Sequence, residues 1–154
     1  MGLDMYVTAK RYLWESGDSN DKDIANAIGK LFPEMTGYRT KQVEMEVMYW
    51  RKANAIHRWF VDNVQDGVDE CQESYLSVDN LRELRDVCEE VLKDPDSAPT
   101  LLPAQSGFFF GGTEYNEGYF DDVNRTLNWL NDLLVKNVLN DDHKQWEFYY
   151  QASW

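Results

Sequence analysis

Both ends of the chain alternate between apolar and polar side chains with a period of two. From Leu3 to Trp14 the odd positions are apolar, with Arg11 as the one break, and in residues 146–153 the even positions are apolar or aromatic. A period of two is typical of a strand with one buried face. The sequence therefore predicts a strand at each terminus, which restricts the chain to folds in which both ends join a sheet.

A third alternation, Val43–Tyr49, switches to helical spacing, so we expect this strand to run into a helix near Trp50–Arg51. Other stretches repeat apolar residues every three or four positions and end at Pro or Gly, as helices do. The predicted helices are 21–32, about 51–66, 78–93 with Ser77 as N-cap, and about 119–138.

Strands separated by helices predict an α+β fold in a single domain, residues 1–154. We expect a small, mostly antiparallel sheet of about three strands, with both termini in strands. Three to four helices would cover one face, and the opposite face would be wetter because each strand carries polar side chains there.

Charge is unevenly distributed along the 154 residues. The formal net charge is −13, from 15 Lys+Arg and 28 Asp+Glu, and residues 61–154 hold 20 of the acids but only 6 of the bases. This balance argues against direct binding of nucleic acid, which needs clustered Lys and Arg. The 14% aromatic content excludes a disordered acidic tail.

Two features bear on the location of the protein in the cell, and both are absences. No stretch reaches the roughly 18 apolar residues of a membrane span, and the N-terminus does not have the pattern of a secretory signal. We expect a cytoplasmic protein in which Cys71 and Cys88 stay reduced.

The first candidate site lies in residues 49–60. If the helix begins near residue 50, Trp50, Asn54 and His57 share one face and Arg51 lies with Lys52 on another. One hypothesis is an anion pocket at a helix start, with His57 as general base if a carboxylate orients it. The alternative is a helix at the core boundary, in which Asn54 and His57 bond to neighbouring loops.

The second candidate is the Gly107–Tyr115 segment of the long 94–118 connection. As structure, Phe108 and Phe110 would be core, only Phe109 would face out, and the glycines would form a hairpin. As function, the segment would be a binding loop with an aromatic anchor. The candidate residues are Phe109, Gly111, Gly112, Glu114 and Tyr115.

The third candidate is an acid-rich surface between residues 62 and 96, which includes Glu89 and Glu90. Such an array would attract a cationic partner and imitate the charge of a nucleic-acid backbone. The alternative is a solvated helix face that confers solubility.

Catalytic and metal motifs are lacking. The chain has two histidines, His57 and His143, and neither Cys-x-x-Cys nor His-Glu-x-x-His. The sequence therefore predicts no catalytic residue, no metal site and no cofactor.

Four blocks, residues 1–6, 49–60, 107–111 and 149–154, resemble a group of small, uncharacterised bacteriophage and prophage proteins. The resemblance implies a phage-encoded accessory protein acting in the bacterial cytoplasm. It carries no catalytic signature, cofactor or assigned residue.

Taken together, these features favour an acidic binding protein that targets a host protein with a basic, nucleic-acid-binding surface. By analogy it could act as an anti-defence inhibitor, as anti-CRISPR proteins do. The rival is a small enzyme or a nucleotide- or phosphate-binding protein that uses residues 51–57 and 107–115. A third candidate is a homodimer formed through exposed aromatic side chains.

Overall fold

The computed structural model describes residues 2–14, 19–135 and 146–154. Its sheet has four strands in the order β2-β1-β4-β3, with every neighbouring pair antiparallel. The α+β class and the antiparallel sheet predicted from the sequence are confirmed. The strands are β1 (Asp4–Tyr12), β2 (Gln42–Arg51), β3 (Ser74–Leu76) and β4 (Glu147–Ser153).

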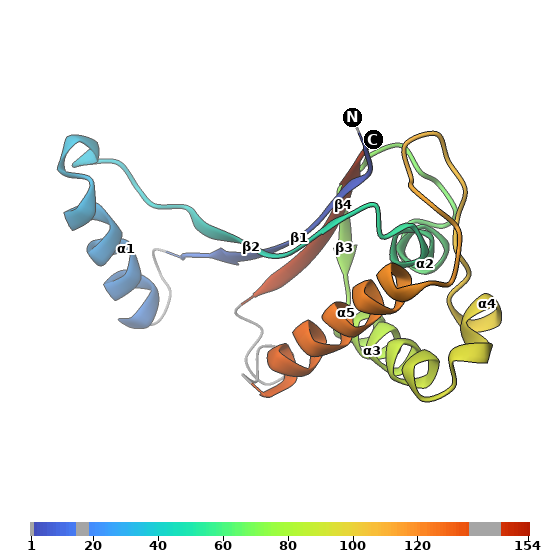
Figure 1. Ribbon diagram of the computed structural model, residues 1–154. Helices are drawn as coiled ribbons and strands as arrows, with labels where there is room; N and C mark the ends of the chain where they lie inside the picture. The colour runs from blue at the N-terminus through green and yellow to red at the C-terminus, as the bar shows by residue number, and fades with distance from the viewer. Residues whose placement is uncertain (1, 15–18, 136–145) are drawn as a thin grey trace.

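The two terminal strands pair with each other in the middle of the sheet. Asp4 lies opposite Ser153 and Lys10 opposite Glu147, so both ends of the chain meet at one edge of the molecule (Figure 1). The predicted number of about three strands was one too low, because β3 has only three residues and is too short to show an alternation.

Helices α2, α3 and α5 lie on one side of the sheet (Figure 1). The described helices are α1 (Ser19–Leu31), α2 (Asn54–Val64), α3 (Val78–Lys93), α4 (Ala98–Leu101) and α5 (Glu117–Val135), with 3-10 turns η1 (Pro33–Met35) and η2 (Pro95–Ser97). The predicted helix 119–138 corresponds to α5, which begins two residues earlier, at Glu117. Residues 136–138 of the prediction lie outside the described residues.

The core forms where these helices meet the inner side of the sheet. Trp50 is fully buried, packs edge-on against Phe60 and Trp129, and donates its indole N–H to Thr126 Oγ1 over 2.9 Å. Phe60 stacks on Tyr150 at 4.0 Å between ring centroids. Aromatic rings from β2, α2, α5 and β4 thus interlock the helices with the sheet.

The opposite side of the sheet is open to solvent, as the alternation predicted. Its side chains include Tyr6, Tyr49, Tyr75 and Tyr149, one from each strand. Two of these hydroxyls bond to carboxylates on the same surface: Tyr49 donates to Asp4 over 2.5 Å and Tyr149 to Glu147 over 2.8 Å. Glu147 raises the pKa of Tyr149 to about 12, because the carboxylate stabilises the protonated phenol.

The predicted junction between the second strand and its helix was wrong in detail. β2 extends through Arg51, and α2 begins only at Asn54. Lys52 turns the chain between them with φ +61°. Trp50 therefore lies on a strand and does not share a helix face with Asn54 and His57. Arg51 ends the strand and Lys52 lies in the turn, so neither is on the helix.

Helix α3 follows its predicted limits closely. The Ser77 hydroxyl accepts the backbone N–H of Asn80, and the Asn80 side chain accepts the backbone N–H of Ser77, which completes a capping box. Leu81, Leu84, Cys88 and Val91 are all buried. Burial raises the pKa of the Cys88 thiol to about 12, so it remains protonated.

Residues 19–41, which we call the arm, project from the far end of the β1–β2 ribbon (Figure 1). We call the rest of the described molecule the body. A buried ion pair between Arg11 on β1 and Asp21 on α1, 2.9 Å apart, fixes the root of the arm. Asp21 also accepts the backbone N–H of Trp14, and Leu13 donates its own N–H to the Lys41 carbonyl. The predicted helix 21–32 is confirmed, but it does not cover the sheet.

Candidate functional site

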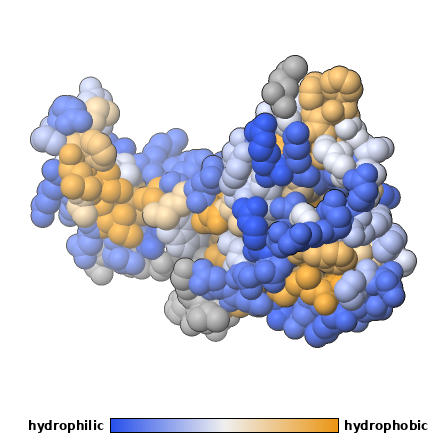
Figure 2. All heavy atoms as spheres, viewed as in Figure 1, coloured by the Kyte–Doolittle hydropathy of each residue, from blue (hydrophilic) through white to orange (hydrophobic). Residues whose placement is uncertain are grey.

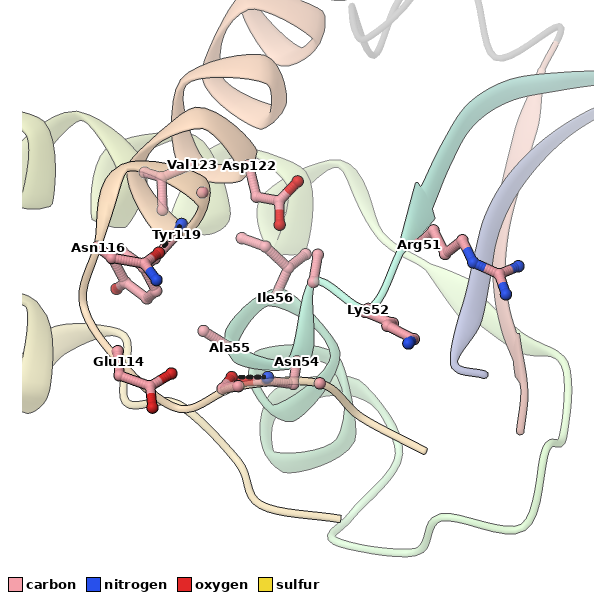
Figure 3. Close-up of a pocket in the computed structure, with 14 residues that line it drawn as sticks. Arg51, Lys52, Asn54, Ala55, Ile56, Glu114, Asn116, Tyr119, Asp122 and Val123 are labelled. Carbon is pink, nitrogen blue, oxygen red and sulfur yellow. Dashed lines mark hydrogen bonds between the residues drawn. The ribbon is translucent and has the colours of Figure 1, made fainter. Parts of the chain in front are cut away.

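A cavity of about 250 Å³ opens where β2 passes into α2 and where the loop after Phe110 leads into α5 (Figure 3). It brings together six of the residues predicted from two separate segments. From the first segment come Arg51, Lys52 and Asn54, and from the second come Gly111, Gly112 and Glu114. The sequence did not indicate the remaining polar contributors, Asn116, Tyr119 and Asp122, which lie in or just before α5.

Asn54 holds one wall of the cavity in place. Its buried amide nitrogen donates to the carbonyls of Phe110 over 3.0 Å and Gly112 over 2.7 Å, and its oxygen accepts the backbone N–H of Gln105 over 3.0 Å. Both N–H donors of the amide are used within the protein, so Asn54 acts as a clamp on residues 105–112.

The backbones of the junction and the loop approach each other closely at Lys52 and Gly111. Gly111 has φ +88°, and a Cβ placed on it would lie 3.3 Å from the Cβ of Lys52. A glycine meets both requirements, a left-handed backbone and a near neighbour. On the other side of the junction, Lys52 donates its backbone N–H to the Leu3 carbonyl over 2.7 Å.

Segments far apart in the sequence therefore meet beside the cavity. Leu3 donates its N–H to the carbonyl of Phe109, and the Trp154 ring packs edge-on against Phe110. The N-terminal, 49–60, 107–111 and C-terminal segments are the four blocks on which the resemblance to phage proteins rests.

Charges of opposite sign flank the cavity. Figure 3 shows Lys52 on one side and Glu114 with Asn116 on the other, with Ala55 and Ile56 between them. Arg51 points away toward β1, where its guanidinium bonds to Asp4 over 3.0 Å. Asp122 adds a second carboxylate, and its pKa is raised chiefly because burial disfavours the charged form.

His57 does not reach the cavity. Its ring is completely buried, with Nδ1 2.7 Å from the Tyr150 hydroxyl and Nε2 3.0 Å from Asp69 Oδ2. In the neutral ring, Nε2–H donates to Asp69 and Nδ1 accepts the Tyr150 O–H. Asp69 also accepts the indole N–H of Trp154 over 3.1 Å. The network ties α2 to β4 and the C-terminus, so a general-base role for His57 on a ligand in this cavity is wrong.

The phenylalanine run is arranged differently from the prediction. Phe108 is 95% exposed, Phe109 is half-buried against the core, and Phe110 is buried against His57. Residues 107–115 contain a turn closed by the Phe110 N–H and the Gly107 carbonyl, with neither a strand nor a hairpin. Phe110 is in the core as predicted, but the exposed ring is Phe108 rather than Phe109, because residues in a turn do not alternate between two faces as residues in an extended segment do.

The remaining predicted residues lie outside the cavity. Tyr115 packs on Tyr119, and its hydroxyl accepts the N–H of Ala104. Glu89 and Glu90 lie on α3, where Glu89 is 3.4 Å from Lys93. They form part of an acidic surface on the body.

The exposed apolar surface of the arm was not predicted from the sequence. Its members are large and surround Pro33: Leu31 is the last residue of α1, and the other three follow the helix. The available signal was that apolar residues continue past the end of the helical period. The residues are Leu31, Phe32, Met35 and Tyr38.

Within the described ranges, no helix has the length and apolar character to cross a bilayer. The same residues contain no group of three or more His, Cys, Asp or Glu side chains placed to hold a metal ion. In comparisons with known proteins, no family model, no curated protein and no solved structure matched the chain.

Proposed function

We propose that this chain is a binding protein that captures a partner protein through its arm. The observation that carries the proposal is the exposure of the arm: between residues 20 and 41 only Asp21 is buried. Leu31 is 74% exposed and Tyr38 77%, and Phe32 and Met35 are each more than half exposed. Figure 2 shows an apolar band on the projecting end of the molecule.

Exposure of this kind has a thermodynamic consequence. Fully burying one large apolar side chain contributes about 1.5–3 kcal/mol, and the arm forgoes that gain at four neighbouring positions. Contiguous apolar patches on a folded surface mark sites of interaction. A partner that covers the band supplies the missing burial.

The charge of the body indicates the chemistry of the partner. Residues 61–154 carry a net charge of −14, whereas the arm has four bases and three acids, a net charge of +1. An anionic body accelerates association with a cationic protein, and the nearly neutral arm then makes the apolar contact. A host protein with a basic, nucleic-acid-binding surface fits both features. In a phage setting, a nuclease of a bacterial defence system is a partner of this kind.

A second copy of the chain fits the arm less well. Each copy carries −13, so two bodies repel each other. The longer edge strand of the sheet is β2, whose open face presents Glu44 and Glu46. Antiparallel pairing of two β2 edges about Met45 would place these carboxylates opposite one another, which is destabilising.

The test compares the wild-type chain with Leu31→Asp/Tyr38→Asp as immobilised baits for bacterial cytoplasmic proteins, quantified by mass spectrometry. We expect the wild type to retain a basic protein that the arm variant loses, and that retention should fall as salt rises. Val68→Asp is the matched control, because Val68 is an exposed apolar residue of the body. The control should retain the same protein.

Two results would overturn the proposal. One is equal retention of every protein by the wild type and the arm variant. The other is a wild-type dimer, measured by light scattering, that Leu31→Asp/Tyr38→Asp converts to a monomer, because the arm would then be covered by a second copy.

A further inference from the structure

We infer that the cavity between the β2–α2 junction and the start of α5 binds a small zwitterion of the free α-amino acid class. This inference is independent of the arm and of any partner protein. It rests on two charges of opposite sign that line one preformed cavity without neutralising each other.

Lys52 is the cationic group of the cavity. Among residues 2–14, 19–135 and 146–154 no carboxylate forms an ion pair with it, whereas its neighbour Arg51 is engaged by Asp4. The long, flexible lysine stem packs against Gly111 and leaves the ammonium able to turn toward a bound carboxylate.

The start of α2 adds hydrogen-bond donors beside Lys52. The first bond within the helix is made by His57, and no side chain caps the N-terminus. The amides of Ala55 and Ile56, two residues that line the cavity, therefore have no intrahelical acceptor. Such amides favour a carboxylate oxygen.

Glu114 and Asp122 supply the anionic side. Glu114 forms no ion pair within the described part of the chain, and its carboxylate folds over Gly112, where a Cβ would lie only 2.4 Å from Oε2. Asp122 also lines the cavity (Figure 3), but it forms an ion pair with Arg125 at 3.6 Å. A ligand ammonium beside Glu114 would therefore supply the counter-charge that this carboxylate lacks within the described part of the chain, and Asp122 would add to the negative potential.

The remaining surface suits an aliphatic or aromatic side chain. Ala53, Ala55, Ile56, Val123 and the ring of Tyr119 provide apolar contacts. The volume of about 250 Å³ falls below the roughly 300–1,000 Å³ of pockets for drug-sized ligands, so the occupant is small.

The cavity is also held open before any ligand arrives. Asn54 fixes one wall, and the Tyr119 hydroxyl fixes the other by donating to the Leu102 carbonyl over 2.7 Å. Pre-organisation lowers the entropic cost of binding. A nucleotide is a poorer fit, because two carboxylates repel its phosphates and only one lysine is available to offset them.

The test measures melting temperature and calorimetric affinity of the full chain with each of the twenty free amino acids. Probes that lack one charge, N-acetyl amino acids and amino acid amides, are run beside inorganic phosphate and AMP. We expect at least one free amino acid to raise the melting temperature with the logarithm of its concentration. Each blocked derivative should bind at least about tenfold more weakly, because it lacks one ionic contact.

Two variants and two controls assign the site. Lys52→Gln and Glu114→Gln should each weaken amino acid binding by about tenfold or more while leaving the fold intact, because both side chains are exposed. Lys93→Gln and Glu90→Gln change the same charges on α3 and should leave the affinity unchanged.

Three outcomes would overturn the inference: no shift with any free amino acid, equal binding of a derivative that lacks one charge, or preferential binding of phosphate or AMP. The inference would also be overturned if Lys52→Gln and Glu114→Gln both bound the amino acid with the affinity of the wild type. The arm variant Leu31→Asp/Tyr38→Asp should bind the amino acid as the wild type does, so failure of this inference is distinguishable from failure of the proposed function.

Discussion

The body and the arm place their apolar side chains in opposite environments. In the body, Trp50, Phe60 and Tyr150 interlock α2 and α5 with the sheet and have almost no contact with water. In the arm, Leu31, Phe32, Met35 and Tyr38 are also large but lie in solvent, and polar contacts at the root, among them the Arg11–Asp21 ion pair, set the position of α1. The difference shows that the body is stabilised by its own packing, whereas the arm displays surface that only another molecule can bury.

The largest expected effect separates a core tryptophan, Trp50, from an exposed tryptophan at the root of the arm, Trp14. Trp50→Ala should lower the free energy of unfolding by about 3–5 kcal/mol, because it opens a cavity and leaves Thr126 without its donor. Trp14→Ala should change it by less than about 0.5 kcal/mol, since that ring is 64% exposed. Urea denaturation measures both, and equal losses would contradict the comparison.

The next effect compares a loop of the body, which Asn54 holds in place, with residues 36–41 of the arm. Asn54→Ala should cost about 2–4 kcal/mol, at about 1 kcal/mol for each of three hydrogen bonds. Hydrogen exchange of the Gln105 amide should accelerate by roughly tenfold or more, because its acceptor is lost. In the wild type, that amide should exchange far more slowly than the amides of residues 36–41. Asn63→Ala, which removes a single bond to the Trp59 carbonyl, is the milder control.

The root of the arm should respond to acid. The hydrogen bond from Arg11 lowers the pKa of Asp21 below its ordinary value of 3.8. The stabilisation is therefore present above pH 3.8 and is lost as the pH falls through the lower folded-state pKa. The amide resonance of Trp14, which donates to Asp21, should shift in that acidic range, and Asp21→Asn should abolish the shift.

An acid response confined to the root of the arm would show that arm and body respond to pH independently. The buried rings of the body should keep their resonances while the Trp14 amide shifts. Asp23→Asn, on the same helix, should behave as the wild type. Loss of the body resonances together with that of Trp14 would show that arm and body unfold as one unit.

The smallest effect compares two residues with positive φ. Lys52→Gly should raise the free energy of unfolding by roughly 0.5–1 kcal/mol, because a left-handed lysine costs about 1–2 kcal/mol and glycine returns part of that through chain entropy. Gly37→Ala has the opposite effect on the backbone: it places a Cβ on a residue of the arm with φ +91°, which strains the arm. We expect it to leave the unfolding of the body unchanged in denaturation curves, and a shift as large as that of Lys52→Gly would refute this.

Local patterns were sufficient for most of the elements. The capping box at Ser77, the apolar stripe of α3 and the alternation of β1 and β4 depend on neighbours in the chain, and each was found where the sequence placed it. The bend at Lys52 was missed because a lysine carries no signal for a left-handed conformation. The orientation of Phe108 was missed because a turn, unlike a strand, has no fixed period.

The candidate site was predicted only in its parts. Arg51, Lys52 and Asn54 were chosen for a helix face that does not exist, and the loop glycines for a hairpin that does not form. They nonetheless line one cavity, because the Asn54 amide bonds to carbonyls more than fifty residues away. Spacing along the chain contains no information about such a bond.

The sequence by itself determined the α+β class, the strands at both termini and the concentration of negative charge after residue 60, since periodicity and composition are local or summed properties. Only the tertiary structure decided that β1 and β4 pair, that His57 is enclosed by Asp69 and Tyr150, and that Lys52 and Glu114 face one cavity. It also decided that the apolar residues around Pro33 stay in solvent. These outcomes depend on which distant surfaces fill the space around a side chain, and burial is a property of the whole packed chain.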